Sequence, residues 1–467
     1  MTALGATIGD KVMALTDYRG VPLSSNNQAS VDGFEHALAL FQGYKADPVA
    51  AIDEVLERDP GFVMGHLLRA GMMLTSSEKA AVPEIRRSFE AAEAQAHNAT
   101  PRERGHMAAI EAWLDGQFHR AIELYGKVLL DEPRDAVALQ VAHLSDFLTG
   151  QSWLLRDHVA RALPFWSEGM PGYGFLHGML AFGLEEMGDY AAAEAAGEKA
   201  LTLNPADAWA AHALAHVMEM QGRLDEGIAF LGRSSRDWAD DNFFAYHNFW
   251  HKSLYHLDRG ETDAVLDLYD TRIHPGPSEV AMELVDAAAL LWRMRLRGHD
   301  VGERWNDVAD SFAGMIEDRY YAFNDLHATM AFIATERWAE AGAVQANVAA
   351  TAQGSDSSAM MAREVGLPTV TAFNAFGRGD YATAVNELLP VRPYANRFGG
   401  SHAQRDVLSL TLIEAALRDG QTSLARGLAA ERTTLKPDSP FNWLLTARAA
   451  EQAGDTDAAE AARARAA

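Results

Sequence analysis

The stretch GDYAAAEAAGEKALTLNP, residues 188–205, contains the pattern that decides the fold. It opens with a glycine, which can adopt the left-handed conformation that ends a preceding helix. It closes with a proline, which cannot continue a helix because it lacks an N–H group. The residues between them read as an amphipathic helix, and the small Ala193 and Ala200 let a neighbouring helix approach closely. The stretch therefore predicts one helix of a helix pair.

A glycine followed seventeen residues later by a proline recurs along the chain. The five pairs are Gly43 with Pro60, Gly116 with Pro133, Gly188 with Pro205, Gly260 with Pro277, and Gly420 with Pro437. The turn glycines Gly116, Gly150, Gly188, Gly222, Gly260 and Gly298 are separated by 34, 38, 34, 38 and 38 residues. A helix–turn–helix unit of about 34 residues is the tetratricopeptide period, and strand signals are almost absent. The sequence predicts an all-α, tetratricopeptide-repeat-like right-handed superhelix of about twelve helix pairs.

The repeat rhythm also predicts how the chain is divided. We expect residues 26–467 to form the helical superhelix and residues 1–25 to form an irregular lead-in. The segment PVRPYANRFGGS, residues 390–401, lengthens one repeat. Long connections in repeat arrays often cover or line a binding face, so this segment is a candidate lid, with a plain solvent loop as the alternative.

Composition narrows the classes of function. The chain has 40 basic and 65 acidic side chains, a formal net charge of −25, which repels phosphate backbones and anionic lipid headgroups. We therefore expect binding to neither nucleic acid nor membranes. The absence of cysteine excludes disulfides, thiolate catalysis and cysteine-based metal sites. No secretion signal or apolar run long enough to cross a membrane is seen, so we expect a soluble, cytoplasmic protein.

Two histidine pairs fall on the first helices of adjacent repeats, in HALAHVMEMQGR (212–223) and HNFWHKSLYH (247–256). In a tetratricopeptide unit whose turn glycine is position 15, positions 2, 5, 6, 9, 12 and 13 face the inside of the superhelix. The residues at such positions are His212, His216, Glu219, His247, Trp250 and His251, and His327 faces the same way further along. Because first helices of neighbouring repeats lie side by side at roughly 8–10 Å, we expect the imidazoles to meet.

A third stretch, GGSHAQRD (399–406), begins with a capping-box pattern in which Ser401 and Gln404 close a helix N-terminus. Arg405 and Asp406 are not explained by that pattern. Arg405 on the first helical turn is suited to clamp a carboxylate or phosphate, so we include both residues among the candidate ligand-binding positions.

The stretches HGMLAFGLEEMGDY (177–190), HALAHVMEMQGR (212–223), FFAYHNFWHKSLYHLDRGE (243–261), FNDLHATMAF (323–332) and GGSHAQRD (399–406) resemble the tetratricopeptide repeat protein 38 family. The resemblance spans most of the chain. It implies an all-helical repeat fold and a soluble protein. It brings no reaction, cofactor or catalytic residue with it.

These observations favour a binding protein that holds a peptide or a small polar ligand in a histidine-rich concave groove. One alternative is an enzyme that uses the same histidines and glutamate for metal-assisted or acid–base chemistry, because histidine pairs four residues apart share one helix face. Another alternative is a scaffold for a partner protein, in which the histidine cluster is a buried polar network that stabilises the superhelix. The sequence assigns no catalytic residue, metal ligand or cofactor.

Overall fold

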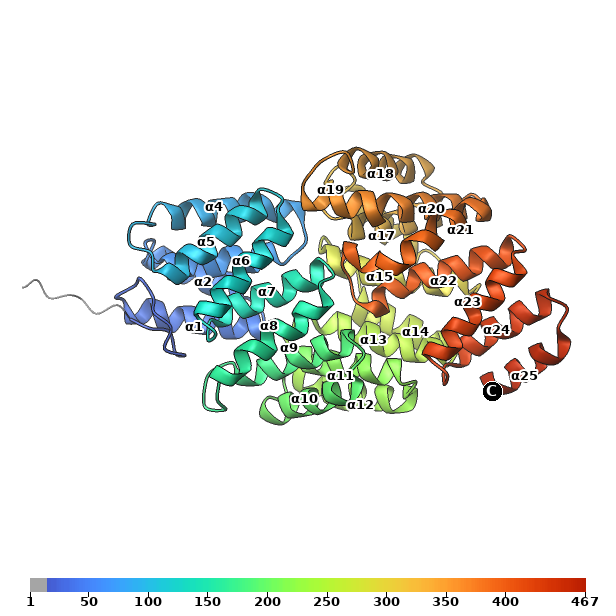
Figure 1. The fold of residues 1–467 in the computed structure, drawn as a ribbon, viewed down its shortest axis with the longest axis horizontal. Helices are drawn as coiled ribbons and strands as arrows, with labels where there is room; N and C mark the ends of the chain where they lie inside the picture. The colour runs from blue at the N-terminus through green and yellow to red at the C-terminus, as the bar shows by residue number, and fades with distance from the viewer. Residues whose placement is uncertain (1–14) are drawn as a thin grey trace, which may run out of the picture.

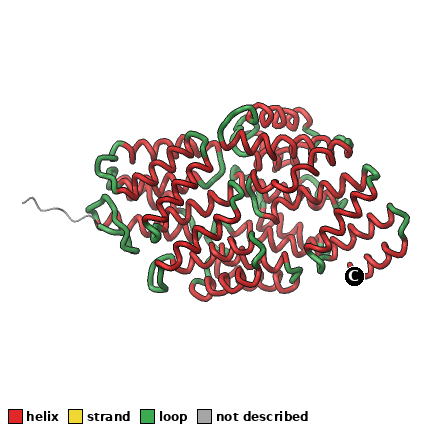
Figure 2. The backbone as a smooth tube through the Cα atoms, viewed as in Figure 1, coloured by secondary structure: helices red, strands yellow, loops and turns green. Residues whose placement is uncertain are grey.

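The computed structural model describes residues 15–467, and almost all of them lie in helices or the short turns between them (Figure 2). In these residues, β-structure is limited to two isolated bridges, Thr16 with Pro22 and Lys45 with Asn242. The α-helices are α1 (Gln28–Gln42), α2 (Pro48–Arg58), α3 (Val63–Leu74), α4 (Val82–Glu93), α5 (Pro101–Leu114), α6 (Phe118–Asp131), α7 (Ala136–Leu148), α8 (Ser152–Ala162), α9 (Tyr173–Glu186), α10 (Tyr190–Leu203), α11 (Ala208–Met220), α12 (Leu224–Trp238), α13 (Ala245–Asp258), α14 (Thr262–Leu268), α15 (Ala281–Leu296), α16 (Arg304–Ala313), α17 (Ala322–Ala334), α18 (Trp338–Thr351), α19 (Ser357–Met361), α20 (Leu367–Gly377), α21 (Tyr381–Val391), α22 (His402–Arg418), α23 (Thr422–Leu435), α24 (Pro440–Gln452) and α25 (Thr456–Ala466).

Short 3-10 or π-helical segments extend or join several of these helices. They are η1 (Lys79–Ala81), η2 (Leu163–Phe165), η3 (Tyr269–Ile273), η4 (Ala362–Gly366) and η5 (Arg392–Phe398).

The turn residues act as the sequence predicts. All six spaced turn glycines, from Gly116 to Gly298, have positive φ angles between 67° and 80°. A side chain at these positions would be strained, so glycine favours the turn between the two helices of a pair. Pro133 and Pro205 follow the ends of α6 and α10 within two residues. The predicted all-α, tetratricopeptide-like architecture is confirmed.

The first helices of successive repeats form the inner layer of the superhelix. In the centre of the chain α9, α11, α13, α15 and α17 pack one against the next, and each also packs against the second helix of its own pair. Figure 1 shows the chain running from α1 at one end of an elongated molecule to α25 at the other, with α11, α13, α15 and α22 near the middle.

Segments far apart in sequence close the inside of the superhelix. The Trp113 indole donates a hydrogen bond to the Tyr320 hydroxyl at 3.0 Å, and Trp292 of α15 donates to Thr411 of α22 at 2.9 Å. Lys436, after α23, reaches Glu219 of α11 at 2.6 Å. The inner surface is therefore packed against later repeats, and the groove that the sequence predicts is largely filled at its centre.

The segment 390–401 is folded back onto an earlier repeat. It contains η5, and Phe398 is fully buried. The Asn396 side chain donates a hydrogen bond to the carbonyl of Gly150, in the turn between α7 and α8, at 2.9 Å. This contact ties the segment to the α7–α8 turn, and its role as a lid stays a prediction.

Part of the predicted lead-in, residues 1–14, lies outside the described residues. The rest is joined to the repeats by ion pairs: Arg19 contacts Glu35 of α1 at 2.7 Å, and Asp17 contacts Arg102 of α5 at 3.3 Å. The domain boundary near residue 26 stays a prediction. Within residues 15–467, none of the helices has the length and apolar character needed to cross a bilayer.

The approach of α9 to α8 yields a test of the packing. A Cβ atom on Gly183 would lie 2.5 Å from the Arg156 nitrogen and 2.6 Å from the Leu155 carbonyl carbon, so backbone would have to move. We expect Gly183→Ala to lower the free energy of unfolding by ~1–3 kcal/mol. The matched control is Gly342→Ala, also inside a helix but with open space around the new methyl group, which should raise stability by ~0.5–1 kcal/mol. Thermal and urea unfolding measure both, and equal effects would contradict the close α8–α9 contact.

Candidate functional site

Helices α11 and α13 place two histidine pairs opposite each other. His212 and His216 lie four residues apart on α11, and His247 and His251 do the same on α13, so each pair occupies one helix face. All four side chains are buried, with exposed fractions of 1%, 0%, 5% and 0%. The expectation that the imidazoles of adjacent repeats meet is confirmed.

The four rings converge through the same atom, Nε2. The Nε2 atom of His212 lies 2.9 Å from that of His216 and 3.1 Å from that of His247. The Nε2 atoms of His247 and His251 are 3.3 Å apart. Ligand atoms of all four residues lie within 4.8 Å of one another.

The opposite nitrogen, Nδ1, of three of these rings faces a carboxylate. His247 Nδ1 lies 2.6 Å from Asp286 Oδ2, His216 Nδ1 lies 3.3 Å from Glu185 Oε2, and His251 Nδ1 lies 3.5 Å from Glu219 Oε2. Of these three contacts, the one between His247 and Asp286 is a hydrogen bond, whereas His216 Nδ1 has His402 Nε2 as its hydrogen-bond partner at 3.3 Å. An ionised carboxylate can only accept a hydrogen bond, so Asp286 favours the His247 tautomer with the proton on Nδ1. That tautomer leaves a lone pair on Nε2.

The His247 lone pair therefore points at the Nε2 atoms of His212 and His251, which lie 3.1 and 3.3 Å away. The buried Nδ1 atoms of His212 and His251 have no hydrogen-bond partner among the described residues, and buried polar atoms without partners are costly. A cation at the centre would give the four facing Nε2 atoms a shared partner. The arrangement is therefore suited to a metal ion.

Burial keeps two of the four rings, His212 and His251, in the neutral form that binds metals. Burial, reinforced by the neighbouring imidazoles, holds the pKa of His212 well below its ordinary value. Burial and the neighbouring imidazoles also hold the pKa of His251 well below its ordinary value. Neutral imidazole is the form that binds metals, so these two rings need no deprotonation before an ion enters.

Three of the Nε2–Nε2 distances are close to those of a tetrahedral zinc site. Zinc is bound by histidine nitrogens at about 2.0–2.1 Å, which places neighbouring ligands of a tetrahedron about 3.3 Å apart. The three Nε2 pairs at hydrogen-bond distance, 2.9, 3.1 and 3.3 Å, fall at or slightly inside that separation, and the ligand atoms of all four residues lie within 4.8 Å of one another. Carboxylates that accept from the outer nitrogen of ligating histidines are the usual support of such sites.

Beside the four histidines lies a second group, formed by Glu185, Glu186 and His402 around the outer edge of His216. His402 Nε2 lies 2.6 Å from Glu185 Oε1. Although burial opposes it, the Glu185 charge raises the pKa of His402 to about 9. His402 and His216 in turn lower the pKa of Glu185 to about 2 despite its burial. His402 and the fully buried Glu185 form an ion pair, which holds Glu185 next to His216.

The other sequence-predicted residues surround the cluster or lie apart from it. The Trp250 ring stacks on His247 with centroids 5.4 Å apart and is fully buried. His327 is bonded to the Phe323 carbonyl at 2.8 Å and lies outside the imidazole group. Arg405 pairs with Glu186 at 3.4 Å, whereas Asp406 binds Arg432 at 2.6 Å. The capping box of Ser401 and Gln404 is present as predicted.

Sequence reasoning missed two carboxylates that matter to the site. Glu185 occupies position 12 of its repeat, the same position as Glu219, so the counting rule applied to Gly188 would have found it. Asp286 stands alone in the apolar run ELVDAAALLW, and a buried charge in such a run requires a partner. In the structure Asp286 binds both His247 and, at 3.3 Å, the amide of Gln404.

Beyond Glu219, on the side away from the histidines, a small charged pocket of about 50 Å³ opens between α11, α13, α15 and the α22–α24 region. We call it the inner charged pocket, and its charged lining residues are Glu219, Asp258, Arg293, Arg297, Asp406, Arg432 and Lys436. Glu219 joins it to the histidine cluster, because one carboxylate oxygen faces His251 and the other binds Lys436.

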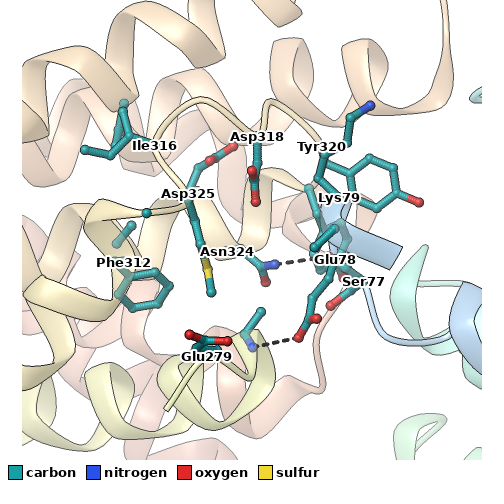
Figure 3. Close-up of a pocket in the computed structure, with 17 residues that line it drawn as sticks. Ser77, Glu78, Lys79, Glu279, Phe312, Ile316, Asp318, Tyr320, Asn324 and Asp325 are labelled. Carbon is teal, nitrogen blue, oxygen red and sulfur yellow. Dashed lines mark hydrogen bonds between the residues drawn. The ribbon is translucent and has the colours of Figure 1, made fainter. Parts of the chain in front are cut away.

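A separate cavity of about 130 Å³ lies between η1 and the α16–α17 connection (Figure 3). Its lining carries Glu78, Glu279, Asp318 and Asp325, and burial raises the pKa of Asp325 to about 7. Figure 3 shows Glu78 accepting a hydrogen bond from the Ala281 backbone nitrogen at 2.9 Å. None of the sequence-predicted site residues lines this cavity.

The fold and its inner-helix cluster define a helical-repeat protein of the tetratricopeptide type. Residues 184–245, which include α10 to α12, match the family model described as tetratricopeptide repeat. Similar solved structures include a human IFIT1 dimer with m7Gppp-AAAA, at 12% identity, 93% of each chain and a TM-score of 0.43. The APC/C hetero-tetramer Cut9–Hcn1 is similar at 11% identity, 94% of this chain, 93% of that chain and a TM-score of 0.35. Yeast Tom70 is similar at 12% identity, 94% of this chain, 97% of that chain and a TM-score of 0.33.

The support that Asp286 gives to the cluster can be measured. Replacing Asp286 by alanine leaves the His247 Nδ1–H and one Gln404 amide N–H without an acceptor in a fully buried place, so we expect a loss of ~1–3 kcal/mol in stability. The control Glu198→Ala removes an exposed carboxylate in the interior of α10 and should change stability by less than ~0.5 kcal/mol. Similar melting temperatures for the two variants would contradict a hydrogen-bonded Asp286.

Proposed function

We propose that this protein is a tetratricopeptide-type binding protein whose inner helices hold one divalent transition-metal ion between His212, His216, His247 and His251. One observation carries the proposal: four buried Nε2 atoms converge, while the Nδ1 atoms of three of these rings face carboxylates. Nitrogen ligands in a tetrahedral arrangement favour zinc, and the absence of cysteine leaves a purely imidazole ligand set.

The ligand count bears on the role of the ion. Four histidines complete a tetrahedral shell, and closed shells are typical of structural zinc, whereas catalytic zinc keeps one position for water or substrate. The two ligand pairs come from adjacent repeats, so the ion would clamp α11 to α13 at the centre of the superhelix. This supports a structural or storage role for the ion over the enzyme alternative.

The ligand expected from sequence reasoning, a peptide or a small polar molecule in a histidine-rich groove, has less support at the histidines themselves. Their burial leaves no surface for a peptide to contact. A small ligand has a better place in the inner charged pocket, which only Glu219 separates from His251. A scaffold role for a partner protein stays a hypothesis that the repeat fold permits.

Three further expectations rest on the sequence alone. Membership of the tetratricopeptide repeat protein 38 family stays a proposal that rests on the quoted motifs. The exclusion of nucleic acid rests on the net charge of −25 and stays a prediction, although the IFIT1 structures carry RNA. The cytoplasm as the location also stays a prediction.

Metal content tests the proposal directly. We expect untagged protein to contain about one equivalent of metal by mass spectrometry, and the cobalt-loaded protein to show the intense visible spectrum of a tetrahedral site. His212→Leu removes one ligand without orphaning a carboxylate, because His212 Nδ1 faces no partner among the described residues. We expect it to weaken metal binding at least about tenfold, since even losing a partner of a ligating histidine costs ~10–100-fold.

The control for this experiment is His256→Gln, which changes a histidine of the same helix that pairs with Glu261 instead of the cluster. It should keep the metal content of the unchanged protein. Wild-type protein that takes up neither zinc nor cobalt stoichiometrically would overturn the proposal, as would His212→Leu with unaltered affinity.

Metal removal gives an independent readout. An ion that binds only the folded chain stabilises it, by ~2.7 kcal/mol when free metal is a hundred times its Kd. We therefore expect chelator-treated protein to melt at a lower temperature and to recover when zinc is added back. In His212→Leu the melting temperature should rise less with zinc at the same concentration, and a response as large as that of the unchanged protein would place the stabilising ion elsewhere.

A further inference from the structure

The inner charged pocket contains two kinds of cationic side chain. Arg432 binds Asp406 with both of its terminal nitrogens, at 2.6 and 3.0 Å, and Lys436 binds Glu219 at 2.6 Å. Despite burial, these carboxylates raise the pKa of Arg432 and of Lys436. Each of these two cations is therefore neutralised by its own carboxylate.

Arg293 and Arg297, one turn apart on α15, differ from them. Among residues 15–467, no carboxylate lies within ion-pair distance of either guanidinium. Arg293 donates to the carbonyls of Ala289 at 3.0 Å and Ala403 at 2.5 Å, and lies over the Trp250 ring. Arg297 donates to the carbonyl of Leu257 and stacks on the Phe441 ring at 3.5 Å, while its Nε has no partner in the same residues.

The third carboxylate of the pocket is already used. Asp258 accepts hydrogen bonds from the Ser439 hydroxyl at 2.9 Å and from the Phe441 backbone nitrogen at 3.3 Å, at the start of α24. Burial lowers the pKa of Arg293, and it lowers that of Arg297 to about 9. In both arginines desolvation outweighs the opposing charge of a nearby carboxylate, Asp406 for Arg293 and Asp258 for Arg297.

Burying a charge is costly unless it is paired, and planar guanidinium groups match the two oxygens of a carboxylate or phosphate. Four cations face three carboxylates in a protein whose net charge is −25, so the pocket is a local exception to the acidic character of the chain. We propose that the inner charged pocket binds a small oxyanion, a carboxylate or a phosphate, through Arg293 and Arg297.

Such an anion would lie near the histidine cluster, because Glu219 lines the pocket and also faces His251. The proposal does not require the metal, since Arg293 and Arg297 contact none of the four histidines through a hydrogen bond. The lining also includes the apolar side chains of Leu254 and Leu257.

Calorimetry and thermal unfolding of the full chain test the proposal with acetate, succinate and inorganic phosphate as separate probes. We expect saturable binding of at least one of them, accompanied by a higher melting temperature. Stronger binding of succinate or acetate than of phosphate would identify a carboxylate site, and the reverse order would identify a phosphate site.

The variant Arg297→Gln keeps a polar, half-buried side chain but removes the charge, and we expect it to weaken binding about ten- to hundredfold. Arg293→Lys keeps the charge but loses the planar fork, and should weaken binding as well. The matched control is Arg295→Gln, on the same helix but exposed, which should bind like the unchanged protein.

Absence of saturable binding for all three anions would overturn the proposal, and so would equal affinities for Arg297→Gln and Arg295→Gln. The metal content of Arg297→Gln separates this proposal from the previous one. If the variant loses anion binding and keeps its metal, the pocket acts independently of the ion. If no anion binds but the metal is present, only the anion pocket fails.

Discussion

The side-by-side packing of α11 and α13 is the constraint on which the rest of the site depends. Histidines four residues apart share a helix face, and two such faces brought together leave their ring nitrogens about one hydrogen-bond length apart. Once the rings meet, their outer nitrogens need acceptors. Asp286 is the acceptor for His247, while Glu185 and Glu219 face His216 and His251 at 3.3 and 3.5 Å, and each carboxylate comes from a different inner helix.

That arrangement explains why so much charge is buried at the centre of an otherwise apolar inner layer. Glu185 is held by His402, Asp286 by Gln404, and Glu219 by Lys436, so each carboxylate has a second partner from the last repeats. Removing one member of such a network leaves its partner unpaired in a place without water, which costs more than the bond itself. The two arginines of α15 are the exception, because no carboxylate among the described residues serves them.

The sequence predicted the parts of this structure that depend on local geometry. A glycine that needs positive φ and a proline that ends a helix act where they stand, so Gly188 and Pro205 set the repeat without reference to distant residues. The position count within a repeat likewise predicted that His212, His216, His247 and His251 face one another. What it could not predict is which later repeat lies opposite, because that depends on the pitch of the whole superhelix. Lys436 and His402, roughly 190 to 220 residues from their partners, are therefore visible only in the structure. For the same reason the expected open groove is filled at its centre.

Helix α22 and the segment after α23 cover the histidines. This cover limits how a bound metal ion could exchange with the solvent. Nothing as large as a hydrated ion can leave a cluster whose rings are almost completely enclosed unless neighbouring turns of the superhelix separate. The lifetime of a bound ion is then set by the rate at which the carboxyl-terminal repeats detach, and not by the strength of any one coordinate bond. Uptake of an ion by the folded chain would need the same opening, so loading and removal would both be limited by how often those repeats detach.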